Sequence, residues 1–276
     1  MNLVLQGPGA SAAQAAQAAR LAGAGAIEQL APTAFRLRGA QDNPGVREWC
    51  REQRLDCAFM PPGRRFADLK LLAMDMDSTL ITIECIDEMG DMAGRKAEIA
   101  AITASAMRGE IAYPESLRRR VSLLGGLGVD ALERVYRERL RLSPGAGALI
   151  AACKRHGVKL LLVSGGFTFF TERLKQRLGI DYTISNELEF RDERLTGGLL
   201  GRIVDADAKA GRFREVAAML GAARGQTVAI GDGANDLKMM AEAGYAVAYR
   251  AKPVVKAQAN CALDFSGLDG VIHLFE

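Results

Sequence analysis

Histidine is scarce in this sequence, which has only His156 and His273 among 276 residues. No group of several histidines and cysteines surrounds either of them, so a histidine-ligated zinc site is not expected. General acid and base chemistry must then rest on carboxylates or lysine. The five cysteines are odd in number and scattered, which predicts reduced thiols in a cytoplasmic protein rather than a disulfide framework.

Long hydrophobic runs and clusters of one charge are also missing. No run of about 20 apolar residues occurs, and the first residues, "MNLVLQGPGASAAQ", lack a charged segment followed by a long apolar one. We therefore expect no signal peptide and no membrane partner. The net charge is only +3, with basic and acidic residues interleaved, whereas a nucleic-acid surface needs clustered basic residues. Nucleic acid is therefore not an expected partner.

The composition that remains is that of a globular protein, with 49% hydrophobic and 25% charged residues. Residues 1–68 carry short apolar runs and helical stretches in the order strand, helix, strand, strand, helix, strand. That order is the ferredoxin-like α+β pattern. The stretch "PPGRRFADLK" has the composition of a linker. It predicts a small domain over residues 1–68 and a large one over residues 69–276.

The large domain has the pattern of an α/β fold with a parallel sheet. Apolar strand candidates recur as "KLLAMD", "VKLLLVSGG", "DYTISNEL", "TVAIGDG" and "YAVAY", and helical stretches separate most of them. Between the first two lie about sixty residues with helical patterns, from Glu84 to Leu142. Such an insertion predicts a helical cap over the carboxyl edge of the sheet, where open α/β sheets bind ligands.

Three polar loops follow three of these strands, and a parallel sheet would bring them to one edge. They are "DMDST", "SGGF" and "GDGANDLKMM". A calcium loop is a poor match for the first, because Leu80 stands where glycine is needed and Ile86 where the bidentate glutamate is needed. The third is no dinucleotide fingerprint, because Asp236 replaces its last glycine.

The paired carboxylates of the first loop fit phosphoryl transfer, with Asp75 as nucleophile and Asp77 as general acid and then base. A carboxylate attacks a phosphoryl group only if their repulsion is neutralised, which calls for a divalent cation and fixed hydrogen-bond donors. Asp232 and Asp236 offer further oxygen ligands for Mg²⁺. Ser164, with the glycines after it, offers a hydroxyl and backbone N–H groups for an anion at a helix start.

Three charged side chains are weaker candidates. Lys209 could add a cation against phosphate, although a solvated lysine is the default expectation. Arg120 shares a helix face with Leu117, Val121 and Leu124, so its guanidinium needs an anionic partner. That partner is either a structural glutamate or the carboxylate of a substrate. Glu84 lies close in sequence to the aspartates, where it could meet a substrate ammonium, although such acidic residues usually lie on solvated helix faces.

Taken together, "DMDSTLITIE", "AMRGEIAYPESLRRRVSLL", "VSGGF", "DADAKA" and "GDGANDLKMM" resemble, in order, the motifs of the phosphoserine phosphatases in the haloacid dehalogenase-like superfamily. The match spans roughly residues 70–250. It implies a Rossmann-like core with a helical cap, hydrolysis of phosphoserine in serine biosynthesis, and Mg²⁺ as cofactor. Residues 1–68 resemble ACT-type amino-acid-binding domains in element order, which suggests a regulatory role or a homodimer contact.

The resemblance also assigns roles to individual residues. It implies phosphorylation of Asp75, acid and base catalysis by Asp77, and Mg²⁺ bound by the Asp75 side chain, the Asp77 carbonyl and Asp232. The remaining implied roles are phosphate contacts for Ser164, Gly165 and Lys209, support of the metal loop by Asn235 and Asp236, ammonium and carboxylate contacts for Glu84 and Arg120, and pocket walls for Met107 and Tyr113. Family members usually carry phenylalanine at the position of Tyr113.

Two rival hypotheses stay open at this point. Another small phosphomonoester, such as phosphothreonine or phosphohomoserine, differs by a methyl or methylene group, which is worth only about 1 to 3 kcal/mol of discrimination. A non-catalytic amino-acid sensor is the second rival. The presence of Asp75, Asp77, Lys209 and Asp232 together argues against it.

Overall fold

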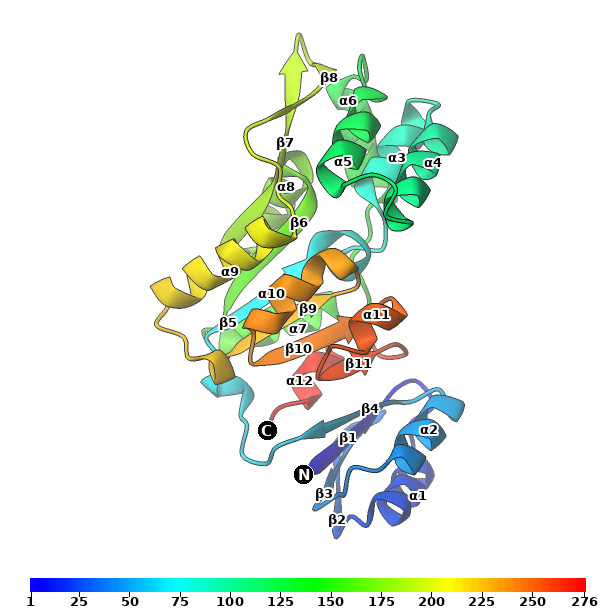
Figure 1. The fold of residues 1–276 in the computed structure, drawn as a ribbon. Helices are drawn as coiled ribbons and strands as arrows, with labels where there is room; N and C mark the ends of the chain where they lie inside the picture. Colours follow the sequence, from blue (N-terminus) through cyan, green and yellow to red (C-terminus); the bar gives the residue numbers. More distant parts are fainter.

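The computed structural model describes all 276 residues, which form two sheets (Figure 1). The first sheet has the order β2-β3-β1-β4 and is antiparallel. Its elements follow the predicted order of strands and helices: β1 (Asn2–Gln6), α1 (Ala12–Ala22), β2 (Ala26–Ala31), β3 (Ala34–Arg38), α2 (Pro44–Glu52) and β4 (Asp56–Met60).

Local sequence explains both helices of this unit. Ser11 and Asn43 are their N-caps and accept hydrogen bonds from backbone N–H groups of the first turn. Pro44 begins α2, where its missing N–H costs nothing. Leu3 and Leu5 of β1 point to these helices, while Val4 between them packs into the core of the larger unit. Strand β1 is therefore buried on both faces.

The second sheet has seven strands in the order β11-β10-β9-β5-β6-β7-β8. All pairs are parallel except β7 with β8. The strands are β5 (Leu71–Asp75), β6 (Lys159–Phe167), β7 (Tyr182–Arg191), β8 (Arg194–Leu200), β9 (Thr227–Gly231), β10 (Tyr245–Tyr249) and β11 (Cys261–Leu263). This is the expected α/β core.

Helices cover both faces of this sheet, which is why its central strands are almost continuously apolar. Leu72 and Met74 of β5 belong to one core cluster, and Leu71 and Ala73 belong to the other. The helices and turns around the sheet are η1 (Phe66–Asp68), α7 (Ala146–Arg155), α8 (Thr168–Leu178), α9 (Ala206–Met219), η4 (Arg224–Gln226), η5 (Ala234–Asp236), α10 (Leu237–Glu242), α11 (Pro253–Lys256) and α12 (Gly270–His273).

The segment after β5 forms a cap of short helices above the sheet (Figure 1). It contains α3 (Cys85–Met92), α4 (Lys96–Met107), α5 (Tyr113–Ser122), α6 (Val129–Arg134) and η3 (Val135–Arg139), after the turn η2 (Met76–Leu80). Residues 84–142 are therefore mainly helical, as expected.

The hairpin of β7 and β8 was not predicted, and it also builds the cap. Its turn rises beside α5 and α6 (Figure 1). Leu195 exchanges backbone hydrogen bonds with the segment after α5: its N–H donates to Leu127 O at 2.9 Å, and its carbonyl accepts from Gly126 N at 2.8 Å. The expected parallel core is thus extended at one edge by an antiparallel strand, which the sequence did not indicate because "RLTGGLL" has too little alternation.

The small unit packs against the C-terminal end of the chain. Asp56 accepts hydrogen bonds from the backbone N–H groups of residues 264, 265 and 266, at 2.7 to 3.2 Å. Buried Arg36 donates to the carbonyls of His273 and Phe275, at 3.1 and 2.6 Å. None of the helices has the length and apolar character needed to cross a membrane.

Candidate active site

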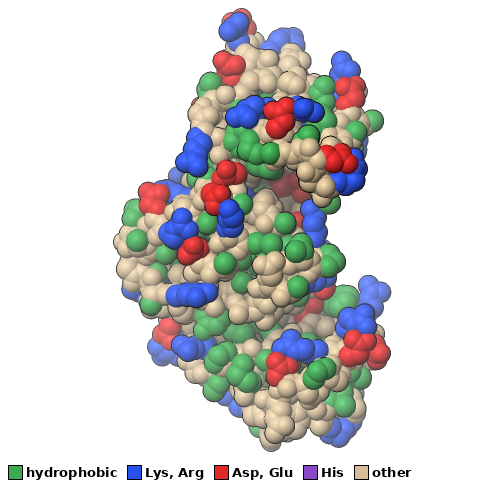
Figure 2. Space-filling model, viewed as in Figure 1, with side chains coloured by type: hydrophobic (Ala, Val, Ile, Leu, Met, Phe, Trp, Pro, Cys, Tyr) green, Lys and Arg blue, Asp and Glu red, His purple; other side chains and the backbone are tan.

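The three predicted loops meet at the carboxyl edge of the large sheet. Strands β9, β5 and β6 are neighbours and parallel, so Asp75 and Asp232 lie at adjacent strand ends and Ser164 of β6 follows Val163, the residue paired with Asp75. A pocket of about 270 Å³ opens there, between the sheet and the cap. Figure 2 shows the surface hollowed between the cap and the body below it, with acidic side chains inside the hollow. Charges of both signs are otherwise spread over this face.

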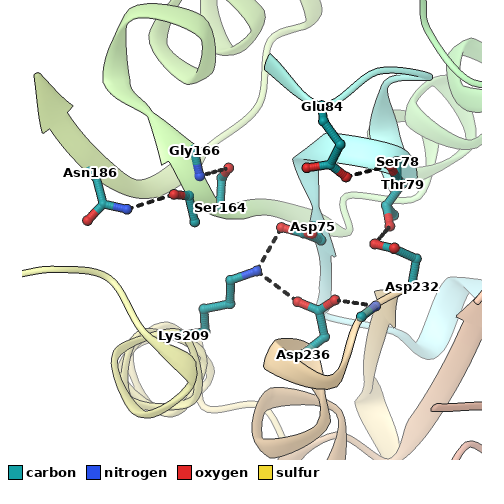
Figure 3. Close-up of polar contacts among 12 residues, drawn as sticks. Asp75, Ser78, Thr79, Glu84, Ser164, Gly166, Asn186, Lys209, Asp232 and Asp236 are labelled. Atoms are coloured by element: carbon teal, nitrogen blue, oxygen red, sulfur yellow. Dashed lines mark hydrogen bonds and ion pairs between the residues drawn. The ribbon is translucent and has the colours of Figure 1, made fainter. Parts of the chain in front are cut away.

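Lys209 lies between two buried carboxylates (Figure 3). Its Nζ donates to Asp75 Oδ1 and Asp236 Oδ1, both at 2.8 Å, and its side chain is 1% exposed. Burial would lower the pKa of Lys209, but Asp236 and Asp75 together raise it, so the ammonium stays charged. Burial also raises the pKa of Asp75 well above its usual value, and the charge of Asp236 adds to this. The other oxygen of Asp75, Oδ2, makes no hydrogen bond within the protein.

Asp77 lies on the turn that follows β5. The turn is possible because Ser78 adopts a left-handed conformation, with φ of 57°. Asp77 Oδ1 accepts from the backbone N–H of Cys85 at 3.2 Å, and a Cβ at Gly166 would come within 2.8 Å of Asp77 Oδ2. Burial raises the pKa of Asp77 to about 7, with a further contribution from the charge of Glu84.

Three carboxylates could hold a metal ion. Oxygens of Asp75, Asp232 and Asp236 lie within 4.8 Å of one another. Asp232 also accepts from the hydroxyl of Thr79 at 3.2 Å, and burial together with Asp236 and Glu84 raises its pKa to about 6. Crowded carboxylates facing one lysine leave an excess of negative charge. This all-oxygen donor set fits a hard divalent cation such as Mg²⁺.

The phosphate-binding candidates differ locally from expectation. Ser164, Gly165 and Gly166 were predicted as a loop at a helix start, but they belong to β6, and α8 begins only at Thr168. The register of β6 against β7 shifts between Val163 and Phe167, so the pairing is interrupted along this stretch. Gly166 N donates to Ser164 Oγ at 2.8 Å (Figure 3). The backbone is thus fixed at the pocket wall.

Arg120 lines the pocket without an acidic partner. Its neighbours in the chain, Arg118 and Arg119, are exposed, as periodicity predicted. The one hydrogen bond of its side chain runs from Nε to Ser116 O at 3.4 Å, and no carboxylate lies within salt-bridge distance. No structural glutamate therefore forms an ion pair with Arg120, whose charge nevertheless lowers the pKa values of Glu84 and Asp87 against the effect of their burial. Glu84 lines the same pocket, accepts from Ser78 Oγ at 2.6 Å, and has a pKa raised by burial.

The remaining predicted residues also reach this site. Asn235, Gly165, Tyr113 and Met107 line the pocket, and Met107 is 66% exposed at its rim. Of the predicted site residues, Ser164, Lys209 and Asp236 do not line it, because all three are buried behind its wall.

Sequence reasoning missed several side chains that position the site. Thr79 binds Asp232, and Ser78 binds Glu84; both belong to the quoted "DMDST" motif, so polar residues beside paired carboxylates were the available signal. Asn186 donates to Gly165 O at 2.8 Å and accepts from Val204 N at 2.8 Å. Lys252, which lies between β10 and α11, also lines the pocket, and no sequence signal marked it.

Two family models match the chain. Residues 72–241 match haloacid dehalogenase-like hydrolase, and residues 3–48 match a domain of unknown function. Among curated proteins, the chain is similar to a phosphoserine phosphatase of a Polaromonas species, with 56% identity over 218 residues that make up 77% of this chain and 92% of that protein.

Solved structures extend the likeness to the whole fold. A probable phosphoserine phosphatase from Vibrio cholerae, in unliganded form, has 37% identity and a TM-score of 0.88, covering 99% of this chain and 86% of that one. A structure described as a phospho-aspartyl intermediate analogue of phosphoserine phosphatase has 36% identity and a TM-score of 0.71, covering 75% of this chain and 99% of that one.

Proposed function

The chain belongs to the haloacid dehalogenase-like hydrolase family and, within it, to the phosphoserine phosphatases, and on that premise we propose that it hydrolyses O-phospho-L-serine to L-serine and phosphate through a phosphorylated aspartate. This reaction is the last step of serine biosynthesis. The observation that carries the proposal is a buried aspartate, Asp75, at the floor of a pocket whose wall presents an unpaired guanidinium and a carboxylate.

In the first step, Asp75 Oδ2 attacks phosphorus while the serine oxygen leaves. Lys209 holds the other oxygen, Oδ1, which fixes the carboxylate for attack. Asp77 donates its proton to the leaving oxygen, so serine departs as a neutral alcohol. In the second step, Asp77 takes a proton from water, whose oxygen then attacks the phosphorus. The bond to Asp75 breaks, and phosphate leaves.

The cation of this reaction would be held by the side chains of Asp75 and Asp232 and by the backbone carbonyl of Asp77. When bound, Mg²⁺ would offset the charge of the phosphoryl oxygens. Thr79 and Lys209 keep the carboxylates oriented through the hydrogen bonds described above. Asn235 and Asp236 support the same loop, since Asp236 accepts from Gly233 N at 3.2 Å.

Phosphoserine carries three charged groups, and the pocket offers a partner for each. The phosphate would lie against Gly165 at the pocket wall and reach Ser164 of β6 and Lys209 of α9, which are buried directly behind that wall. On the cap side, Arg120 would bind the carboxylate and Glu84 the ammonium. A guanidinium without a protein carboxylate partner is costly to bury, so a ligand carboxylate stabilises it.

The proposal is tested by phosphate release from a panel of phosphomonoesters that includes phosphoserine, phosphothreonine and phosphohomoserine, with and without Mg²⁺. We expect Mg²⁺-dependent preference for phosphoserine, and Asp75→Asn should abolish turnover while the fold stays intact by circular dichroism. Similar activity on all of the esters would contradict the assignment of phosphoserine as the substrate. Near-normal turnover by the Asp75→Asn variant would contradict the role of Asp75 as nucleophile. No activity on any ester would favour the amino-acid sensor.

We further propose that residues 1–68 form an ACT-like domain that joins two copies of the chain, with residues 69–276 as the phosphatase domain. Strand β2 is at the edge of the small sheet and has no strand on its outer side. All five cysteines are free, which supports a cytoplasmic location. Light scattering during gel filtration tests the dimer, and the mass of a single chain would contradict it.

A further inference from the structure

Tyr113 connects the cap to the core at the pocket. It is the first residue of α5, and its hydroxyl donates to the carbonyl oxygen of Gly165 in β6 at 3.2 Å. Among the pocket-lining side chains of the cap, it is the one that hydrogen-bonds to the core sheet. Burial raises the pKa of this hydroxyl, so it stays a protonated donor at neutral pH.

The acceptor belongs to the peptide group between Gly165 and Gly166, whose carbonyl and N–H are both hydrogen-bonded. Gly165 O also accepts from Asn186 Nδ2 at 2.8 Å, and Asn186 itself is 2% exposed (Figure 3). The N–H of the same peptide unit, that of Gly166, donates to Ser164 Oγ at 2.8 Å. Tyr113 therefore completes the bonding of the peptide that lies beside the proposed phosphate contacts.

The approach of the tyrosine requires the glycine. A Cβ at Gly165 would come within 2.5 Å of the Tyr113 hydroxyl and 3.5 Å of its ring. The ring end thus occupies the space that a side chain at Gly165 would fill. Phenylalanine would keep the ring in this space but would lose the hydrogen bond.

We propose that the Tyr113 hydroxyl is a latch that holds cap helix α5 against the phosphate-side strand of the core. Seven residues along the same helix lies Arg120, which faces the same pocket. When this hydrogen bond is formed, the distance between the cap side of the pocket, which carries Arg120, and the phosphate side, which carries Gly165, is fixed. The latch is a positioning device that rests on the proposed function, and it acts on closure of the cap rather than on bond breaking.

Its first test needs no substrate. In Tyr113→Phe, we expect hydrogen exchange of the amides at 116–121 to be about fivefold faster than in the wild type, the factor for one neutral hydrogen bond. Tyr136→Phe is the matched control, because Tyr136 is another half-buried cap tyrosine and its hydroxyl makes no hydrogen bond. Equal exchange in the wild type and Tyr113→Phe would overturn the latch.

The second test separates closure from chemistry. Without the latch, substrate binding must supply the closing energy, so KM should rise about fivefold for phosphoserine and for p-nitrophenyl phosphate alike, with kcat not lowered. A lowered kcat at unchanged KM, or a loss confined to phosphoserine, would contradict the latch. A wild-type protein without phosphoserine activity would refute the proposed function instead, and the exchange difference would still support the latch.

Discussion

Arg120 is the residue on which the choice of substrate depends. Arg120→Ala should lower kcat/KM for phosphoserine by roughly 10- to 100-fold, because a charged hydrogen-bond pair is worth about 1.5 to 3 kcal/mol. The loss for p-nitrophenyl phosphate, which has no carboxylate, should stay below about threefold. Arg118→Ala is the control, since Arg118 is exposed on the opposite face of α5. Equal losses for both substrates would remove the assigned role.

The role of Asp232 as a metal ligand can be tested by thermal stability, without an assay of activity. Mg²⁺ at about a hundredfold above its Kd should stabilise the wild-type protein by about 2.7 kcal/mol, seen as a higher Tm. Asp232→Asn should lose this response, while its metal-free Tm should not fall, because the change relieves repulsion from Asp236 and Glu84. Asp207→Asn, at an exposed site, should keep the full response. A Mg²⁺ response retained by Asp232→Asn would contradict this ligand.

At this scale, the sequence predicted the charged residues that bear the chemistry better than those that orient them. Two aspartates after a strand have few structural uses, so Asp75 and Asp77 were visible. Arg120 was visible because its helix face is apolar. Asn186 was not, because its role depends on meeting Gly165 across two strands, and register between strands is a tertiary property.

At the scale of elements, the β7–β8 hairpin should matter as much to the cap as its helices do. Leu195 is 3% exposed and belongs to the main core cluster, whereas Leu200 of the same strand is 44% exposed. We expect Leu195→Ala to lower the free energy of unfolding by about 3 kcal/mol. Leu200→Ala should change it by less than about 0.5 kcal/mol. Urea denaturation measures both, and equal effects would show that the hairpin is not anchored by Leu195.

The same hairpin contains the strand that could not be predicted from the sequence. Strands β5, β6, β9 and β10 are long apolar runs, since both of their faces are buried, and they were found. Strand β8 lies at the edge of the sheet, its sequence "RLTGGLL" contains two glycines, and only Leu195 is buried. Its pairing is fixed by hydrogen bonds to β7 and to the segment after α5, which no local pattern encodes.

At the scale of the whole molecule, the small unit is attached through apolar contacts of β1 and β4 and through a few buried polar groups. The order of its elements was predictable from the sequence, but its orientation was not, because nothing in the sequence marks Arg36 and Asp56 as buried. In the structure both are buried and bind backbone groups near the C-terminus. Buried charges of this kind are stable only with such partners. The two units are thus joined by more than their linker.

Arg36 provides the test of this attachment. Arg36→Ala leaves the carbonyls of His273 and Phe275 without their donor, so we expect the free energy of unfolding to fall by about 2 to 3 kcal/mol. Arg38→Ala is the control on the same strand, because Arg38 is 46% exposed and its ion pairs are solvent-screened, so its loss should cost less than about 1 kcal/mol. Urea unfolding monitored by circular dichroism measures both changes. If Arg36→Ala and Arg38→Ala unfold at the same urea concentration, the contacts of Arg36 do not stabilise the attachment of the small unit, which would then depend on Asp56 and on the apolar contacts of β1 and β4.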